Sequence, residues 1–496
     1  MKEFFFDNKK NNLFDFIRYC WQSQKQEHFK KNICEELNLT PVVLEGIIQE
    51  IEELCEEYSG ISIISNQQTI NLSFKSSFLI NKVYVMLFKE TIGYKFLSAI
   101  FEEKFLSLEQ FADENFVSAR TIQRQMKSLS QLMKRYELNL SLKKKELILG
   151  EEYRIRHFFL AIFWHAYEER DDFYIKYQHN YELFKPLVRN RVLNLTPGEL
   201  KKLFLLLRIT QWRLKHGHTI HHLPLSITEV RHPFYTRQYF KENLVDKYFR
   251  KSALLNEEEI NYLYYMFTVL PVYNYECIDK VNHIDNFFNA DYQILTSSLL
   301  ENFYKLTKIQ LTQREEKFLS LNTVYQSSYY LSFGSKDRVA SFTDAQYFLF
   351  EEKRRAHIHE LADLLADSIP LDDTKWQRVL KSEAFRFSIF QMLVWVLGNH
   401  EHLIRVAFLT KYGKIHGDIL ANRLKHLSPR PVMIVDFRDE PDVVITDYYA
   451  NEPELNNTQA VFIGWSVKPS EVEWLRTIDT IDRVREDRWE ISNDML

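Results

Sequence analysis

One order of helices and strands occurs twice in the first 150 residues of this chain. In the first occurrence, the apolar pattern predicts helices from residue 13 and over residues 29–37, and Pro41 stands in the first turn of a third helix. Two strands follow, at residues 61–63 and 70–74, whose apolar and polar residues alternate. Helix, helix, turn, helix and hairpin is the order of a winged helix-turn-helix domain.

The second occurrence begins at Ser107, which is placed to cap a helix with Gln110 at the capping-box position. Ser118 stands 77 residues after Pro41 and caps the third helix, whose apolar residues recur at steps of three and four. Residues 138–149 form the hairpin, with three lysines at its tip. We therefore expect two tandem winged helix-turn-helix domains.

The length of 496 residues suggests roughly three to five domains. With 11 glycines and 12 prolines the chain favours long helices, so we expect a multidomain, mainly α fold. The formal net charge of −4 means that any DNA-binding surface has to be a local basic patch. The four cysteines form no CxxC pair, which is typical of a reducing compartment. Neither a signal peptide nor a long uncharged apolar run is found, so we expect a cytoplasmic protein without membrane segments.

The third helices of the two copies differ in charge. Residues 41–58 carry six glutamates and no lysine or arginine. Residues 117–149 carry eight basic residues against Glu137 and Glu146. Because duplex DNA presents dense negative charge along its axis, the second copy is predicted to be the better DNA reader.

The apolar face of the second copy's third helix fixes which residues point outward. With Ile122, Met126 and Leu129 buried, the opposite face of the first turns is predicted to enter the major groove. Arginine pairs bidentately with guanine and glutamine with adenine, while lysine and threonine suit phosphates. The predicted DNA-binding residues are Arg120, Thr121, Gln123, Arg124 and Lys127, with Lys143, Lys144 and Lys145 at the tip of the wing.

Two alternatives stay open from the residues alone. The basic helix and hairpin could be a solvated part of an ordinary helical bundle that binds no DNA. The first copy could contact DNA through Lys30 and Lys31, or it could serve as a packing or dimer surface.

Two motifs stand out in the second copy, residues 118–124 (SARTIQR) and residues 149–156 (LGEEYRIR), the latter running into the apolar residues 158–163 (FFLAIF). In these motifs the chain resembles the Mga family of virulence regulators from Gram-positive bacteria. The resemblance implies two winged helix-turn-helix domains, two all-α bundles similar to the regulation domains of the sugar phosphotransferase system (PTS), and a C-terminal α/β domain similar to enzyme IIB components. The corresponding ranges are 1–76, 77–157, 158–282, 283–398 and 399–496.

The middle of the chain is helical and aromatic, and two predicted helix starts in it echo one another. Leu-Thr opens a helix at Thr196 and again at Thr312, 116 residues later. In the resembled family, histidines of these helical domains accept phosphate from the phosphocarrier protein HPr, and the added charge could shift the packing of a homodimer. By that resemblance the phosphoacceptor candidates are His216, His218 and His283. Each could instead be an ordinary loop residue, and residues 216–222 lack a carboxylate or cysteine at ligand spacing, so no metal site is predicted.

From residue 402 onward the pattern changes to short apolar runs bounded by turns, typical of buried parallel strands alternating with helices. The loop at residues 410–414 occupies the place where a transporting enzyme IIB carries its phosphorylated cysteine. No cysteine follows Cys277, so cysteine phosphotransfer by this domain is excluded and a sensor or dimerisation role is expected. The loop could bind an anion at the start of the next helix, or it could be purely structural.

The residues predict a protein that binds promoter DNA. The resemblance implies a homodimeric transcription regulator that activates virulence or carbohydrate-linked genes and is controlled by histidine phosphorylation. No enzymatic activity, catalytic residue, cofactor or metal is expected. An RNA-binding antiterminator is one alternative, but such proteins begin with a small strand-rich module, whereas this chain begins with helices. A sugar phosphotransferase component is the other alternative, and the missing cysteine disfavours it.

Overall fold

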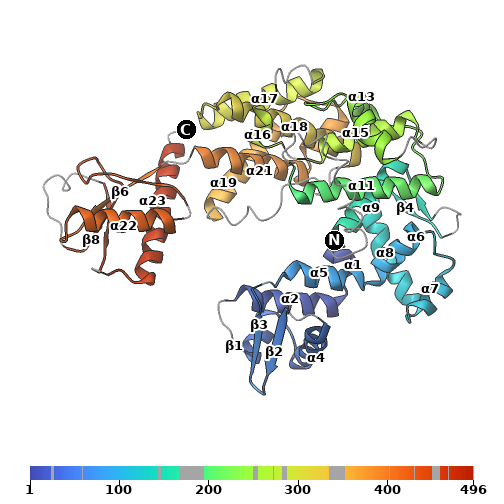
Figure 1. Cartoon of the computed structure of the whole chain (residues 1–496), viewed down its shortest axis with the longest axis horizontal. Helices are drawn as coiled ribbons and strands as arrows, with labels where there is room; N and C mark the ends of the chain where they lie inside the picture. Colours follow the sequence, from blue (N-terminus) through green and yellow to red (C-terminus); the bar gives the residue numbers. More distant parts are fainter. Residues whose placement is uncertain are drawn as a thin grey trace. The chain divides into compact units, whose positions relative to one another are not determined.

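The computed structural model of the chain is mainly helical (Figure 1). The described residues are 1–23, 27–57, 60–76, 78–142, 147–166, 195–249, 255–271, 273–281, 288–334, 352–400, 403–428, 430–448, 459–466 and 468–494. Among these residues, no helix combines the length and the apolar character that crossing a membrane requires. The chain divides into two compact units. The first unit comprises Met1–Gln293, Leu321–Ser341 and Asp372–Phe385, and the second comprises Ile294–Ser320, Phe342–Leu371 and Arg386–Leu496.

The predicted domain ranges do not coincide with these two units. The helical bundle expected at residues 283–398 is shared between them, since residues 321–341 and 372–385 belong to the first unit. The boundary expected between residues 157 and 158 falls inside one continuous helix, α9 (Glu152–His165). The second copy of the repeated order therefore continues into the following helical segment without a linker.

The first 74 residues fold in the predicted order with two added elements, a short N-terminal helix and a short strand. The elements are α1 (Lys2–Phe5), α2 (Asn8–Gln22), β1 (Glu27–Phe29), α3 (Lys30–Glu36), α4 (Pro41–Glu57), β2 (Ile61–Ser65) and β3 (Thr69–Phe74). Phe29, which the sequence pattern assigned to a helix, instead ends β1 and pairs with Thr69. The short strand β1 is thereby held on the edge of the hairpin, and the antiparallel sheet has the order β1-β3-β2.

The next helices are α5 (Ile80–Lys89), α6 (Ile92–Phe101), α7 (Leu108–Glu114) and α8 (Ala119–Arg135). Both predicted serine caps are formed: Ser107 accepts a hydrogen bond from the N–H of Gln110, and Ser118 accepts one from the N–H of Thr121. The side chain of Gln110 donates to Glu114 at 2.8 Å, so the expected reciprocal half of the capping box is replaced by a contact along the helix.

The hairpin after α8 is shorter than the alternating residues suggest. Its strands are β4 (Asn139–Leu140) and β5 (Ile148–Leu149), which pair antiparallel. Gly150 follows β5 with a φ of 153°, and a Cβ atom built there would overlap the side chain of Leu138. Because Leu138 is buried, glycine is required where the hairpin turns into α9.

Replacing Gly150 with alanine is expected to lower the free energy of unfolding by about 2–4 kcal/mol, since it adds overpacking to a backbone conformation that L side chains rarely adopt. The matched control is Gly46→Ala in α4, where the new Cβ meets nothing within 4 Å. That change is expected to stabilise by about 0.5–1 kcal/mol, because alanine loses less backbone entropy in a helix. Urea denaturation followed by circular dichroism measures both, and equal effects would contradict the packing argument.

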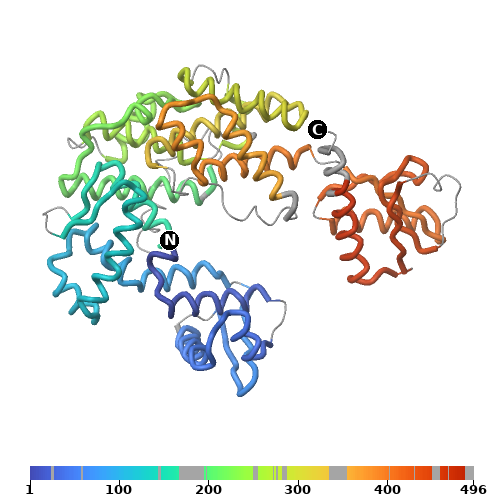
Figure 2. The backbone as a smooth tube through the Cα atoms, turned by 180° about the vertical axis from the view of Figure 1, so that it is seen from behind, coloured from blue at the N-terminus to red at the C-terminus, as the bar shows by residue number. Residues whose placement is uncertain are grey.

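The remaining helices form the middle of the chain. They are α11 (Pro197–Lys215), α12 (Leu225–Thr228), α13 (Arg237–Phe240), the π-helical turn η1 (Lys241–Val245), α14 (Asp246–Tyr248), α15 (Glu257–Val269), α16 (Tyr275–Ile278), α17 (Ala290–Thr307), α18 (Gln313–Phe333), α19 (Glu352–Asp367), α20 (Thr374–Leu380) and α21 (Glu383–Asn399). The predicted Thr196 and Thr312 stand directly before α11 and α18. Each threonine exchanges hydrogen bonds with the glutamate three residues later and so caps its helix. Helix α11 packs along α9 (Figures 1 and 2).

The C-terminal part of the second unit is an α/β fold around a four-stranded parallel sheet of order β7-β6-β8-β9. Its elements are β6 (Ile404–Leu409), α22 (Lys414–Leu427), β7 (Val432–Ile434), β8 (Val443–Thr446), β9 (Val461–Gly464) and α23 (Glu471–Asp494). Leu424 of α22 and Trp474 of α23 pack into one core with Val406, so both helices cover the same face (Figures 1 and 2). The expected alternation of strand and helix fails between β7 and β8, where residues 435–442 form no helix.

Candidate nucleic-acid interface

Helix α8 begins with a cap that engages one of the predicted DNA-binding residues. The N–H of Thr121 donates to the Ser118 hydroxyl at 3.2 Å, and the two hydroxyl oxygens lie 2.9 Å apart. Such a cap satisfies a backbone N–H that the helix itself leaves unpaired. Thr121 is half-buried, so its side chain fixes the start of the helix rather than standing free on its surface.

One face of α8 is buried in the core of the first unit. The fully buried side chains on this face are Ile122, Leu129, Leu132 and Met133. Met126, which the sequence pattern places on the same face, is half-buried. The register predicted from the apolar spacing is therefore the register of the helix.

A second face of α8 holds the N-terminal helix α1. Gln125 and Ser128 both donate to the carbonyl oxygen of Phe4, at 2.6 and 3.1 Å. Arg135 pairs with Glu3 at 3.1 Å and its guanidinium lies 4.4 Å from the centre of the Phe4 ring. Arg135 contributes to the basic charge of residues 117–149, but its guanidinium is already paired with α1 of the same chain.

The third face of α8 carries four polar side chains, Arg120, Gln123, Arg124 and Lys127. Positions separated by three and four residues share a helix face, so these side chains project together. All four are exposed, and within the described ranges none forms a hydrogen bond or an ion pair with another residue. Among the described residues, no hydrogen bond or ion pair has to break before this face can meet a partner.

The lysines expected at the tip of the wing, Lys143, Lys144 and Lys145, lie outside the described residues. The described ends of the hairpin, β4 and β5, directly follow α8 in the chain, and β4 packs on α8. The lysines therefore remain a prediction from the sequence.

The corresponding helix of the first copy, α4, presents a different surface. Its outward side chains include exposed Glu45, Glu52 and Glu53, and Val42 in its first turn is 82% exposed. Lys30, one of the two lysines considered for DNA contact, pairs with Glu45 at 2.7 Å. The basic charge available to this copy is thus partly neutralised by its own glutamates, which favours α8 as the reader.

Comparison with known protein families decides what this region is. Residues 76–163 match the model of the Mga helix-turn-helix domain. The chain contains an Mga-like helix-turn-helix domain. The matched residues include α5 to α8, the hairpin and most of α9, so the exposed face of α8 belongs to the Mga helix-turn-helix domain. Such a domain indicates a DNA-binding transcriptional regulator. None of the curated proteins compared with the chain matches it.

A histidine-rich loop, residues 216–222, lies against the Mga helix-turn-helix domain. It lines a cleft of about 710 Å³ together with Glu103, Ile148 and Gly150 of that domain. His216 lies against the Trp212 ring, with its Nδ1 2.8 Å from the Trp212 carbonyl oxygen. His218 places its Nε2 2.9 Å from the Glu103 carboxylate. Two predicted phosphoacceptor candidates therefore line one cleft, whereas the third, His283, lies outside the described residues.

A buried ion network fixes this loop to α9. Arg156 of α9 and Glu259 of α15 are fully buried and form a bidentate pair, and Arg156 also donates to the His218 carbonyl at 2.9 Å. Glu259 accepts from the N–H of Ile220 at 2.7 Å. Both ends of the network are thereby bonded to the backbone of the loop.

Glu152 extends the network to α11. It accepts hydrogen bonds from Arg156 at 2.9 Å and from Arg213 at 2.6 and 2.9 Å. Burial by itself raises the pKa of Glu152, but the hydrogen bonds and charges of the two arginines outweigh it and hold the pKa below its usual value. In the sequence, Arg156 stands out only as the last residue of the motif at residues 149–156. The spacing of Glu152 and Arg156, four residues apart in an apolar helix, was the available signal.

Two other histidines, His157 and His232, are buried, and His165 is half-buried. Burial lowers the pKa of His157 to about 3 and that of His165 to about 4, and it places the pKa of His232 well below its usual value. Their imidazoles are neutral at physiological pH and belong to the core. No cluster of histidine, cysteine and carboxylate side chains suited to a metal ion occurs among the described residues.

The loop after β6 is closed by a carboxylate of the same unit. Asp447 accepts from the Thr410 hydroxyl at 2.7 Å and from the N–H of Lys411 at 3.0 Å. The Thr410 hydroxyl and the Lys411 N–H are therefore already paired with an internal anion, which favours the structural alternative for this loop.

Proposed function

We propose that this protein is a transcription regulator that reads promoter DNA with α8 in the major groove. The observation that carries the proposal is the exposed set of Arg120, Gln123 and Arg124, which has no partner among the described residues and lies on one face of an Mga helix-turn-helix domain. These side chains lie in the first turns of α8, where a recognition helix meets base edges. Arginine suits guanine and glutamine suits adenine, while Lys127, one turn further along, suits a phosphate.

Selection of bound duplexes from a random pool by the full-length protein tests this function. Repeated selection is expected to enrich one short sequence, and binding to it should weaken linearly with the logarithm of the salt concentration, because lysine and arginine release counterions from the phosphates. A pool that stays random after selection would overturn the proposal.

The proposal extends to the domains on either side of this helix-turn-helix domain. Residues 1–76 form another winged helix-turn-helix domain, and the helical middle is a pair of PTS-regulation-like bundles. The C-terminal α/β part is an enzyme-IIB-like platform for homodimerisation without enzymatic activity. The protein acts in the cytoplasm as an activator of virulence or carbohydrate-linked genes. The first copy has a packing or dimer role in this proposal. The support is that α4 is acidic and that Lys30 is neutralised by Glu45.

Control is proposed to act through phosphorylation of the histidine loop by HPr. The contact of His216 Nδ1 with a carbonyl oxygen requires the proton on Nδ1, which leaves Nε2 as the nucleophile. His218, with Nε2 toward Glu103, keeps Nδ1 for the same purpose. A phosphate on His218 brings about two negative charges next to Glu103, so the attraction between the loop and the Mga helix-turn-helix domain becomes a repulsion.

Replacing both His216 and His218 with alanine is expected to abolish phosphate transfer from HPr to this loop. Incubation with labelled phosphoenolpyruvate, enzyme I and HPr, followed by peptide mapping of residues 195–225, measures the transfer. The matched control is His221→Ala with His222→Ala, two exposed histidines of the same loop, which should retain the label. Equal labelling of both double variants would rule out His216 and His218 as acceptors.

A further inference from the structure

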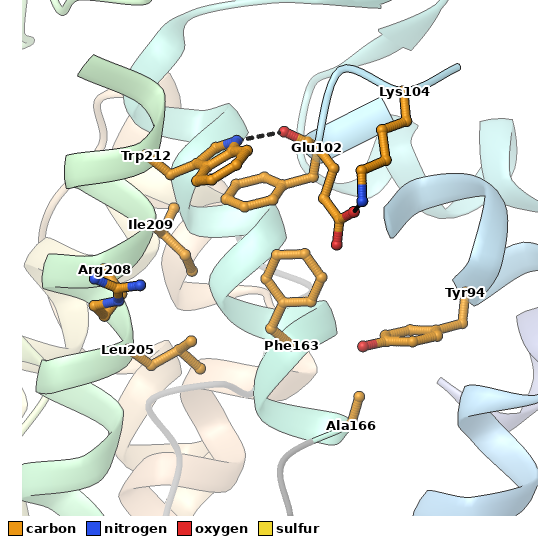
Figure 3. A pocket seen from close by; sticks show the side chains of 10 residues that line it. Tyr94, Glu102, Lys104, Phe163, Ala166, Leu205, Arg208, Ile209 and Trp212 are labelled. Atoms are coloured by element: carbon orange, nitrogen blue, oxygen red, sulfur yellow. Dashed lines mark hydrogen bonds and ion pairs between the residues drawn. The ribbon is translucent and has the colours of Figure 1, made fainter. Parts of the chain in front are cut away.

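A second cavity of the first unit, which we call the aromatic pocket, lies between α6, α9 and α11 (Figure 3). Its volume is about 440 Å³, within the range of sites that hold small molecules. Its aromatic lining consists of Tyr94, Phe101, Phe163 and Trp212. It is separate from the cleft of the histidine loop and from the outward face of α8.

The aromatic walls are held in place by one another. Phe101 lies edge-on to Phe163 at a centroid distance of 4.8 Å and stacks with Trp212 at 6.1 Å. The Trp212 indole N–H donates to the Phe101 carbonyl at 2.8 Å, and the Tyr94 ring meets Phe163 edge-on at 6.3 Å (Figure 3). A pocket whose rings already fix each other loses little conformational entropy when a planar ligand enters. The walls therefore favour a ligand with an aromatic ring.

The charges of the lining favour an anionic group on that ligand. Lys104 is paired with Glu102 at 2.6 Å, so these two charges compensate each other. Arg208 donates to Gln211 at 3.0 Å and hydrogen-bonds the Tyr248 hydroxyl, both neutral groups. Within the part of the chain that the structure describes, Arg208 has no carboxylate partner. A guanidinium at the edge of an apolar pocket is the group that a carboxylate would pair with.

We propose that the aromatic pocket binds a small aromatic carboxylate, with its ring among the four aromatic side chains and its carboxylate toward Arg208. Tyr94, Phe101 and Phe163 belong to the Mga helix-turn-helix domain, whereas Trp212 and Arg208 belong to α11 outside it. The ligand touches both elements at once, so its binding is an input to the DNA-reading domain that does not require phosphorylation.

Titration of the full-length protein with 2-naphthoate, followed by isothermal calorimetry and saturation-transfer NMR, tests the proposal. One saturable site is expected. Arg208→Gln should weaken binding about tenfold or more, because a charge-assisted hydrogen bond is lost. The matched control is Arg231→Gln, which replaces an exposed arginine of the first unit outside the pocket. This variant should bind 2-naphthoate like the native protein. The neutral analogue 2-naphthalenemethanol should bind native protein as weakly as 2-naphthoate binds Arg208→Gln.

Ile209→Phe provides a second variant, because it fills the pocket from α11 and should remove binding of both compounds. Circular dichroism shows whether this variant folds, and if it does not, the comparison of Arg208→Gln with Arg231→Gln decides. No saturable binding, equal affinity in the two arginine variants, or equal binding of acid and alcohol would each overturn the proposal. The readout uses no DNA and no HPr, so it is independent of the outcome for α8 and for the histidine loop.

Discussion

Replacing Arg120 and Arg124 with alanine is expected to weaken binding to the selected duplex by roughly 30-fold to 25,000-fold. Each bidentate arginine–guanine pair contributes about 1–3 kcal/mol of discrimination, so losing two costs about 2–6 kcal/mol. Both side chains are exposed and have no partner among the described residues, so the unfolding midpoint should stay within about 0.5 kcal/mol of the native value. Fluorescence anisotropy at one fixed salt concentration measures the affinity.

Two comparison variants separate base reading from charge. Lys127→Ala removes a predicted phosphate contact, so it should weaken binding to selected and random duplexes alike and lower the salt slope by about one. Lys30→Ala with Lys31→Ala removes two positive charges from the first copy and should leave the affinity nearly unchanged if that copy only packs. Native affinity in the Arg120 and Arg124 variant would show that another surface reads the DNA.

The position of α8 could be predicted from the sequence because every signal for it is local. Ser118 caps its own helix three residues away, and the apolar steps from Ile122 to Met133 fix the buried face within one element. Once the buried face is known, the residues on the opposite face are known to be exposed. They are Arg120, Gln123, Arg124 and Lys127. The same reasoning placed the starts of α11 and α18, where a threonine and a glutamate exchange hydrogen bonds within one turn.

The features that the sequence analysis missed depend on residues far apart in the chain. Strand β1 has three residues, too few for a periodic pattern, and exists because it pairs with β3 about forty residues later. Arg156 meets Glu259 across 103 positions, and Gln125 meets Phe4 across 121 positions. The division of residues 283–398 between the two compact units also depends on which helices pack together, and local spacing does not contain that information.

The buried network should give the largest change in stability. Glu259→Gln keeps the shape of the side chain and its capacity to accept from Ile220, but it removes the charge of the bidentate partner of the fully buried Arg156. Arg156 then has to share the Glu152 carboxylate with Arg213. Removing one member of a buried ion pair costs about 3–5 kcal/mol, because the remaining charge stays out of water. Thermal unfolding followed by circular dichroism should show a clear fall in the midpoint of the first unit.

The network also predicts how stability depends on pH. The pKa of Glu152 is lowered in the folded protein, so its stabilisation is complete above the pKa of the unfolded state, about 4.3, and is lost as the pH falls through the lowered value. The same loss should be smaller in Arg213→Met, because a main cause of the lowered pKa is then gone. Unfolding midpoints between pH 3 and pH 7 measure the difference.

Glu257→Gln is the matched control for Glu259→Gln, two positions away in α15. Glu257 pairs with Arg237, but its side chain is 63% exposed, and a surface pair contributes about 0–1 kcal/mol. Adding Arg156→Met to Glu259→Gln should restore much of the lost stability, because no buried charge then lacks its partner. If Glu259→Gln proved as mild as Glu257→Gln, the ion network would not be what holds the histidine loop to α9.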